Sequence, residues 1–337
     1  MKKFLALILA LAMALSLVAC GSNNNGNDNS NDNSGTTKQL RFVTGGESGT
    51  YYGFGSVIAT HATNNAGVSV VALSSDGSKA NVFSLEENEA ELGFCQSDVM
   101  AYAYNGTNIF ADSGRVDCFS VLGALYTEQV QIVTTNPDIK SVADLEGKSV
   151  SVGAPASGVY FNAVDILSAY GIGDLDADGK FTKINATYQS FGDSADALKN
   201  GQIDAAFIVA GAPTTAVADL ATTKSVNLVS LDDEHIEKLL ASSPYYTKCV
   251  IPAETYNMAA DVTTVGVGAV VLVRDDVSED AVYALCADIF DNASSLVDTH
   301  AKYGEVTLEY GASMTAVPYH AGAAKYFAEK GFTVPAK

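Results

Sequence analysis

One short pattern occurs twice in this chain, and it limits the possible folds more than any other feature. The first copy, residues 48–52 (Ser-Gly-Thr-Tyr-Tyr), follows the apolar segment 40–44. The second copy, residues 157–161 (Ser-Gly-Val-Tyr-Phe), follows the segment 149–153. Each copy predicts a strand, a turn of small residues and the first turn of a helix, where backbone N–H groups stay free beside the positive end of the helix dipole. Two such turns facing one another would form a cleft that holds an anion without a charged side chain.

Strands and helices are predicted in alternation along most of the chain. Strands are predicted over 40–44, 68–73, 92–95, 119–126, 129–134, 149–153, 181–188, 203–209 and 263–273. Helices are predicted over 52–64, 78–88, 99–104, 161–170, 194–200, 281–290 and 319–330, with a one-turn helix capped by Ser141 and closed by Gly147 and a further helix opened by Pro213. This order predicts an α/β fold with a mostly parallel sheet flanked by helices.

The second half of the chain repeats the order of elements in the first half. Residues 85–94 match residues 198–207 at equal spacing, each segment being a helix end, a turn and a short buried strand. A chain of 337 residues is long enough for two cores. We therefore expect two related lobes, with lobe I over 38–127 plus 265–337 and lobe II, over 128–264, inserted in it. The two crossings between them would form a hinge.

The N-terminus carries the features of an export signal. Lys2 and Lys3 precede an apolar stretch over 4–18 that is shorter than a membrane span, and Cys20 follows it. This end resembles a bacterial lipobox, which predicts a signal peptide over 1–19 and lipidation of Cys20; the alternative is a plain secretory peptide with an incidental cysteine. Residues 20–37, rich in Asn, Ser, Gly and Asp, predict a lipid-anchored disordered linker. The protein is then extracytoplasmic and anchored to the outer face of the cell membrane.

Charge and cysteine usage exclude several classes of protein. The formal net charge of -20 opposes binding to nucleic acid, which needs clustered Lys and Arg. The four cysteines beyond Cys20 lie far apart in apolar segments and form no metal-binding pattern. An extracytoplasmic location would permit a disulfide, but we expect buried free thiols. The glycine-rich turns do not fit the nucleophile elbow, the phosphate loop or the dinucleotide pattern. We expect no cofactor and no enzymatic activity.

A series of short motifs resembles the TAXI family of solute receptors, which serve TRAP (tripartite ATP-independent periplasmic) transporters. The matching stretches, in chain order, are 49–52, 93–99, 125–128, 139–153, 157–158, 201–205, 210–213, 244–246, 251–253, 264–265 and 279–283. The resemblance covers the chain from about residue 40 to its end. Where the family often has Thr and then a charged or polar residue after the second Ser-Gly, this chain has Val159 and Tyr160. That departure leaves the ligand open.

The resemblance implies a two-lobed fold like that of type II periplasmic binding proteins, with the cleft between the lobes. It implies no catalysis. Such a receptor closes over a small carboxylate, such as glutamate, glutamine or a dicarboxylate, and delivers it to a membrane permease driven by an ion gradient. A second interpretation is a ligand-sensing lipoprotein that signals to a membrane partner. We expect a monomer, with contacts to the ligand, to the TRAP permease and, through the anchor, to the membrane.

The candidate ligand-binding residues lie in the two turns and at the ends of predicted strands. They are Ser48, Gly49, Thr50, Tyr51, Tyr52, Asp76, Ser78, Gln96, Ser97, Tyr126, Ser157, Gly158, Ala210 and Gly211. The turns would supply N–H groups and hydroxyls to a carboxylate, and Gln96 would read an amide or a carboxylate. Asp76 would pair with a ligand ammonium group. The alternative is that the turn residues only cap helices and that Tyr52 belongs to the core.

An acidic segment offers a weaker candidate for metal binding. Asp174, Asp176 and Asp178, followed by Gly179, resemble the first part of a calcium loop. The twelfth position holds Asn185 instead of the usual Glu, and no pair of helices flanks the loop. The competing interpretation is an acidic turn that leads into the strand predicted at Phe181.

Overall fold

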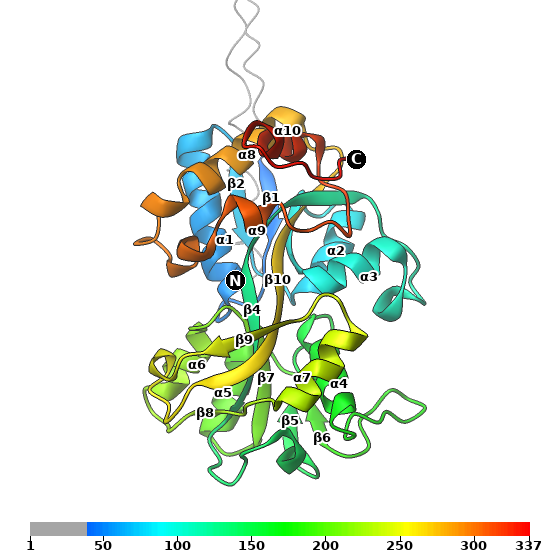
Figure 1. Ribbon diagram of the computed structural model, residues 1–337, viewed down its shortest axis with the longest axis vertical. Helices are drawn as coiled ribbons and strands as arrows, with labels where there is room; N and C mark the ends of the chain where they lie inside the picture. Colours follow the sequence, from blue (N-terminus) through cyan, green and yellow to red (C-terminus); the bar gives the residue numbers. More distant parts are fainter. Residues whose placement is uncertain (1–38) are drawn as a thin grey trace, which may run out of the picture. The chain divides into compact units, whose positions relative to one another are not determined.

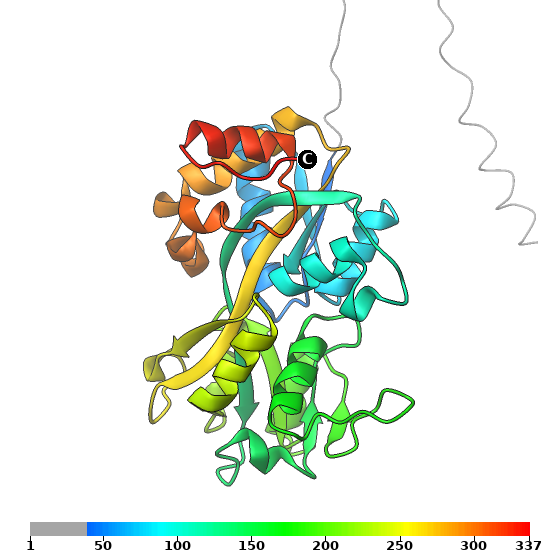
Figure 2. The ribbon, with the colours of Figure 1, turned by 45° about the vertical axis from the view of Figure 1, so that its right-hand side comes forward.

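Two long strands join the two halves of the described chain. The computed structural model describes residues 39–337, so the predicted signal peptide, Cys20 and the linker to residue 37 lie outside the described residues. Strands β4 (Phe119–Thr134) and β10 (Val262–Arg274) pair antiparallel along most of their lengths, with two shifts in register. Both ribbon views show these strands running from one group of helices to the other (Figures 1 and 2).

Lobe I surrounds one end of the two long strands. Its sheet has the order β2-β1-β3-β10-β4, built from β1 (Leu40–Val43), β2 (Val70–Leu73) and β3 (Leu92–Gln96), with β1 parallel to both neighbours and β3 antiparallel to β10. Its helices are α1 (Thr50–His61), α2 (Ser78–Glu86), α3 (Ser97–Asn105), α8 (Glu279–Asp291), α9 (Leu308–Gly311) and α10 (Ala321–Glu329).

Lobe II surrounds the other end. Here β4 pairs with β7 (Ala205–Ala210), and the parallel strands β5 (Ser149–Ser151) and β6 (Asn185–Thr187) complete the order β4-β7-β5-β6. Two further strands add to the long ones: β8 (Asn227–Leu228) pairs with β4, and β9 (Thr247–Ile251) pairs with β10. The helices are α4 (Val159–Ala169), α5 (Phe191–Lys199), α6 (Thr215–Ala221) and α7 (Asp233–Ser242).

Each lobe packs around hydrophobic residues of its own. The lobe I core takes its buried residues from 40–126 and 269–327, and the two clusters of lobe II take theirs from 130–267. The cores therefore change over along β4 between Tyr126 and Val130, and along β10 between Val267 and Ala269. The predicted two-lobed α/β fold is confirmed, with a mixed sheet in place of a mostly parallel one. The predicted boundaries of the lobes stay a prediction.

The local predictions hold best where capping residues mark an element. The one-turn helix after Ser141 forms over Val142–Leu145 with a reciprocal capping box to Asp144, and Gly147 takes a positive φ of 74°. The prediction of separate strands over 119–126 and 129–134 is wrong, because Tyr126, Thr127 and Glu128 continue the ladder opposite β10. The prediction that Pro213 opens a helix is also wrong. The N–H of Thr214 is bound by the Tyr256 hydroxyl at 2.7 Å, and α6 begins only at Thr215.

Close packing of α1 on the sheet fixes where this helix begins. A Cβ atom on Gly55 would lie 2.6 Å from the Thr44 methyl carbon and 3.3 Å from the Phe94 ring. The Thr44 side chain has little freedom to move, because its hydroxyl donates to the Leu73 carbonyl at 2.7 Å. Gly55 thus lets the helix lie directly on β1 and β3, one turn after Thr50.

Gly55→Ala is expected to lower the free energy of unfolding by about 1–3 kcal/mol, because the new methyl group overpacks the contact between α1 and β1. Gly53→Ala, in the same helix, is the matched control. Its Cβ would meet only His300 at 3.6 Å, so the gain in helix propensity should leave the variant as stable as the wild type or more stable. Urea denaturation measures both variants. Equal behaviour of the two would contradict the packing argument.

Candidate ligand-binding site

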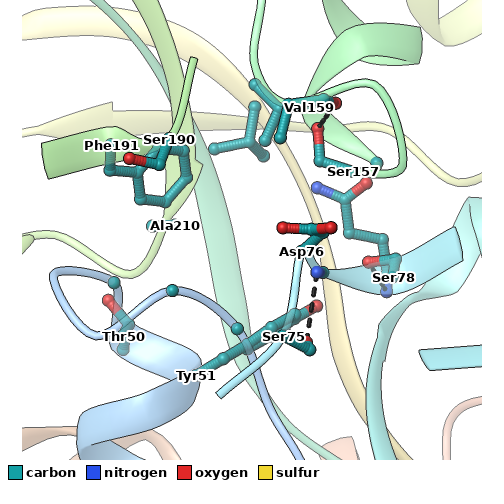
Figure 3. Close-up of a pocket in the computed structure, with 18 of the residues that line it drawn as sticks. Thr50, Tyr51, Ser75, Asp76, Ser78, Ser157, Val159, Ser190, Phe191 and Ala210 are labelled. Carbon is teal, nitrogen blue, oxygen red and sulfur yellow. Dashed lines mark hydrogen bonds between the residues drawn. The ribbon is translucent and has the colours of Figure 1, made fainter. Parts of the chain in front are cut away.

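A cavity of about 130 Å³ lies between the two lobes. Lobe I contributes the turn before α1, the turn before α2 and Gln96 at the end of β3, and Glu128 lies on β4 where this strand passes from one lobe to the other. Lobe II contributes the turn before α4, the turn before α5, and the end of β7 at Val209 and Ala210. In Figure 3, Thr50, Tyr51, Ser75 and Asp76 face Ser157, Val159, Ser190 and Phe191 across this space.

Four helices begin at the cavity. Their first residues, Thr50 of α1, Ser78 of α2, Val159 of α4 and Phe191 of α5, all line it. The first turn of a helix has N–H groups without partners inside the helix, and the dipole places partial positive charge there. The cavity therefore collects the positive ends of two helices from each lobe, which suits an anionic group of a ligand.

The two Ser-Gly turns line the same cavity. A Cβ on Gly158 would lie only 1.8 Å from Gln96 Oε1, so the lobe II turn approaches a lobe I side chain too closely for any other residue. A Cβ on Gly49 would lie 3.3 Å from the Phe191 ring of lobe II. Glycine at these two positions thus allows the lobes to approach one another at the cavity wall.

Gln96 is a buried polar side chain whose amide oxygen has no hydrogen-bond partner. The residue is 1% exposed, and its backbone N–H donates to Ser78 Oγ at 3.1 Å, which fixes the end of β3 against the start of α2. No hydrogen bond reaches Oε1, although the atom is buried at the cavity wall. A buried acceptor without a donor costs free energy, so this atom favours a ligand that brings an N–H or O–H group.

Glu128 places a carboxyl group in the cavity wall. It is 2% exposed, and Tyr51 Oη donates to its Oε2 at 2.8 Å. Burial raises the pKa of Glu128 to about 8, against the opposing effect of hydrogen bonds from Tyr51 and Gln96. The sequence analysis did not single this residue out. Its signal is that Glu128 is the single charged residue in the apolar strand Phe119–Thr134.

Direct hydrogen bonds join the lobes around the cavity. Thr50 Oγ1 donates to the Gly211 carbonyl at 2.8 Å, and the Ala216 N–H donates to the Ser48 carbonyl at 3.1 Å. Asn162 Nδ2 of α4 donates to Asp98 Oδ2 of α3 at 3.0 Å. The structure thus shows the lobes in contact, with the cavity enclosed between them.

Most of the predicted site residues come together, although their role in binding stays a prediction. Those that line the cavity are Gly49, Thr50, Tyr51, Asp76, Ser78, Gln96, Ser157, Gly158 and Ala210. Ser48 lies in the adjoining hollow at the mouth. Four others are outside the lining: Tyr52, Ser97, Tyr126 and Gly211. The buried ring of Tyr126 packs edge-on against Phe54, and the Ser97 hydroxyl accepts the Gly268 N–H.

The start of α5 is a part of the site that the sequence analysis missed. The predicted helix began at Ser194, whereas α5 begins at Phe191 with Ser190 at its N-cap. Ser190 Oγ accepts the Asp193 N–H at 3.2 Å and donates to the Asp193 carboxylate at 2.7 Å. A serine followed three residues later by an acidic residue is a capping pattern, so this signal would have found the helix start.

The acidic segment near residue 176 forms a turn. Asp176 Oδ1 accepts the N–H groups of Asp178 and Lys180 at 2.9 Å, and Asp174 pairs with Lys183. Leu175 and Phe181 form an antiparallel bridge across this turn. Within residues 39–337, no group of three or more His, Cys, Asp or Glu side chains is placed to hold a metal ion, so the calcium interpretation finds no support here. No helix in the same range is both long and apolar enough to cross a membrane.

A protein-family model described as the NMT1-like family matches residues 42–331. The chain belongs to the NMT1-like family. This NMT1-like family is of the periplasmic solute-binding type, so the cavity between the lobes belongs to a solute-binding protein. The narrower assignment to the TAXI receptors stays a prediction.

Solved structures similar to this NMT1-like protein include three binding proteins or ligand-binding domains. The periplasmic aliphatic sulphonate binding protein SsuA from Escherichia coli is 16% identical over 86% of this chain and 82% of its own, with a TM-score of 0.43. The alkanesulfonate-binding protein SsuA from Xanthomonas axonopodis pv. citri, bound to MOPS, is 14% identical over 86% and 83%, with a TM-score of 0.45. The GluR0 ligand-binding core from Nostoc punctiforme, in complex with L-glutamate, is 14% identical over 79% and 95%, with a TM-score of 0.43.

Glu128→Gln is expected to raise the free energy of unfolding at pH 8 and above, because a neutral amide replaces a buried charge. The advantage over the wild type should shrink as the pH falls from about 8 toward 4.5, since the carboxyl group of the unfolded chain, which ionises above about 4.5, is then protonated as it is in the folded protein. Urea denaturation at a series of pH values measures the difference. Glu237→Gln, at an exposed site on α7, is the control and should show no such trend. An advantage that grows toward low pH would contradict the buried position of this charge.

Proposed function

We propose that this protein is the extracytoplasmic, lipid-anchored solute-binding component of a TRAP transporter. Its solute is a small carboxylate, such as glutamate, glutamine or a dicarboxylate, which it delivers to a membrane permease driven by an ion gradient. The observation that carries the proposal is the convergence of four helix N-termini, two from each lobe, on one cavity. The family assignment supports the solute-binding part, and the motifs shared with TAXI receptors support the TRAP partner.

Binding follows from the chemistry of the cavity walls. A carboxylate between the lobes accepts N–H groups from the start of α1 and α2 on one side and from α4 and α5 on the other. Because these donors lie on different lobes, the bound solute stabilises the closed arrangement over the open one. Closure also removes water from around the carboxylate, and the lower local dielectric strengthens each contact with the helix ends.

The lipid anchor and the linker would keep the binding domain near its permease. The predicted lipidation of Cys20 and the polar segment 20–37 support an anchored receptor whose body moves freely within a short distance of the membrane.

A thermal-shift screen of the purified domain with carboxylates, amino acids, sugars and metal ions tests the ligand class. Stabilisation by sugars or metal ions alone would reject it. Uptake by vesicles that contain the permease tests the partner, and uptake that needs ATP in place of an ion gradient would reject the TRAP assignment.

Thr50→Val is expected to weaken binding of the tightest carboxylate in that screen by up to about tenfold, because the hydrogen bond from Thr50 to the Gly211 carbonyl joins the lobes beside the ligand. Thr60→Val is the matched control. Its hydroxyl donates at 2.7 Å to the Ser56 carbonyl within α1, so its loss should leave the affinity unchanged. Isothermal titration calorimetry measures both. An equal effect of the two substitutions would contradict a role for the contact between the lobes.

A further inference from the structure

Acidic side chains line the cavity and its mouth. Glu128 lies in the wall, and Asp76 lines both the cavity and the two hollows at its mouth, where Glu47, Asp193 and Asp196 join it. No lysine or arginine is among the described residues that line the cavity or these two hollows. Figure 3 shows Asp76 between the lobes, facing the turn that contains Ser157. A ligand with a second carboxylate would find no cationic side chain there and would face several like charges.

Two buried polar groups in the cavity wall favour a positively charged ligand group that donates hydrogen bonds. Gln96 Oε1 is a buried acceptor without a donor, and Glu128 is a buried acid whose Oε2 accepts from the Tyr51 hydroxyl. Gln96 belongs to β3 and Glu128 to β4, the two strands that border β10 on either side. A ligand ammonium group carries three N–H donors and a positive charge, so it would satisfy the Gln96 oxygen and neutralise the Glu128 carboxylate together.

The helix ends define a second region of opposite polarity. The starts of α1, α2, α4 and α5 supply partial positive charge and free N–H groups but no full charge. One carboxylate is enough to use these donors. The cavity of about 130 Å³ thus offers both donors for an anion, made of backbone groups, and acceptors for a cation, made of acidic and amide side chains.

We propose that the preferred solute is an amino acid of net charge zero, with its carboxylate at the helix N-termini and its ammonium group held by Glu128 and Gln96. This inference rests on the proposed function and narrows it, because it ranks zwitterions above dicarboxylates and above glutamate. Asp76 and the acidic residues of the mouth favour entry of the ammonium end and repel solutes with excess negative charge.

The proposal also predicts that binding releases a proton. Burial raises the pKa of Glu128 to about 8, so near pH 7 its carboxyl group is largely protonated in the free protein. An ammonium group favours the ionised form, so binding would release the proton to solvent, and affinity would rise as the pH increases from 6 to 8. The titratable or charged groups that face Glu128 are Tyr51, Cys95, Asp98, Tyr126, Lys302 and Tyr310.

Calorimetry with matched solutes tests the inference. The set is L-glutamine, L-glutamate and glutarate, together with L-leucine and its isostere 2-hydroxy-4-methylpentanoate. We expect at least one of the two neutral amino acids to bind. If glutamine binds, its affinity should be about tenfold or more higher than that of glutamate and glutarate. If leucine binds, its affinity should exceed that of its hydroxy acid by about the same factor. Binding in two buffers of different ionisation enthalpy should show proton release at pH 7.

Variants locate the ammonium site. Glu128→Gln should bring the affinities for the amino acid and its hydroxy analogue to within about threefold of each other, and it should abolish proton release. Asp76→Asn should reduce the difference between these two affinities by a smaller factor. Asp138→Asn, at an exposed site in the turn after β4, is the control and should change neither. Because the test on the unmodified protein needs only solutes and pH, it stands even if the Glu128 variant does not fold.

The possible failures are distinguishable. If glutarate or the hydroxy acid binds as tightly as the amino acid, the zwitterion inference is overturned while carboxylate binding stands. If 3-methylbutylamine, which is leucine without its carboxylate and is titrated alongside the set, binds while none of the carboxylates does, the proposed carboxylate function fails and so does the zwitterion inference. If none of these solutes binds and a sugar or a metal ion does, both proposals are rejected.

Discussion

The pairing of β4 with β10 is the interaction on which the rest of the structure depends. Each strand belongs to the lobe I core at one end and to the lobe II core at the other. Because one ladder of hydrogen bonds extends through both cores, it holds the lobes so that the starts of α1 and α2 face those of α4 and α5 (Figure 1). The same ladder carries Glu128 to the cavity wall, so the element that connects the lobes also contributes to the site.

Burial of polar groups links the site to closure. Gln96, Glu128 and Thr50 are each less than 10% exposed with the lobes in contact. Asp98 of lobe I accepts from Asn162 of lobe II, which also donates to the Tyr246 hydroxyl at 2.9 Å. Burial raises the pKa of Asp98 to about 6. Closing the lobes therefore removes several polar groups from water, and the contacts among them, with those to a solute, offset that cost.

The opposing polarities of the cavity follow from two kinds of donor and acceptor. Helix ends provide positive potential from the backbone, which needs no basic residue and is compatible with a chain of net charge -20. Carboxyl groups at the wall and the mouth come from side chains on loops, on α5 and on β4. The proposed solute, which carries charges of both signs, would contact the helix ends with its carboxylate and the acidic side chains with its ammonium group.

The sequence by itself determined the elements that local chemistry specifies. The Ser-Gly turns after two strands, the capping box at Ser141 and the alternation of strands and helices follow from propensities within a few residues, and they predicted much of the fold and both turns of the cavity. Only the tertiary structure decided that Gln96 meets Gly158 at the cavity wall, that Glu128 lies there, and that Tyr126 and Ser97 face elsewhere. These contacts join residues far apart in the chain. They depend on the β4–β10 register and on lobe packing, which no local pattern encodes.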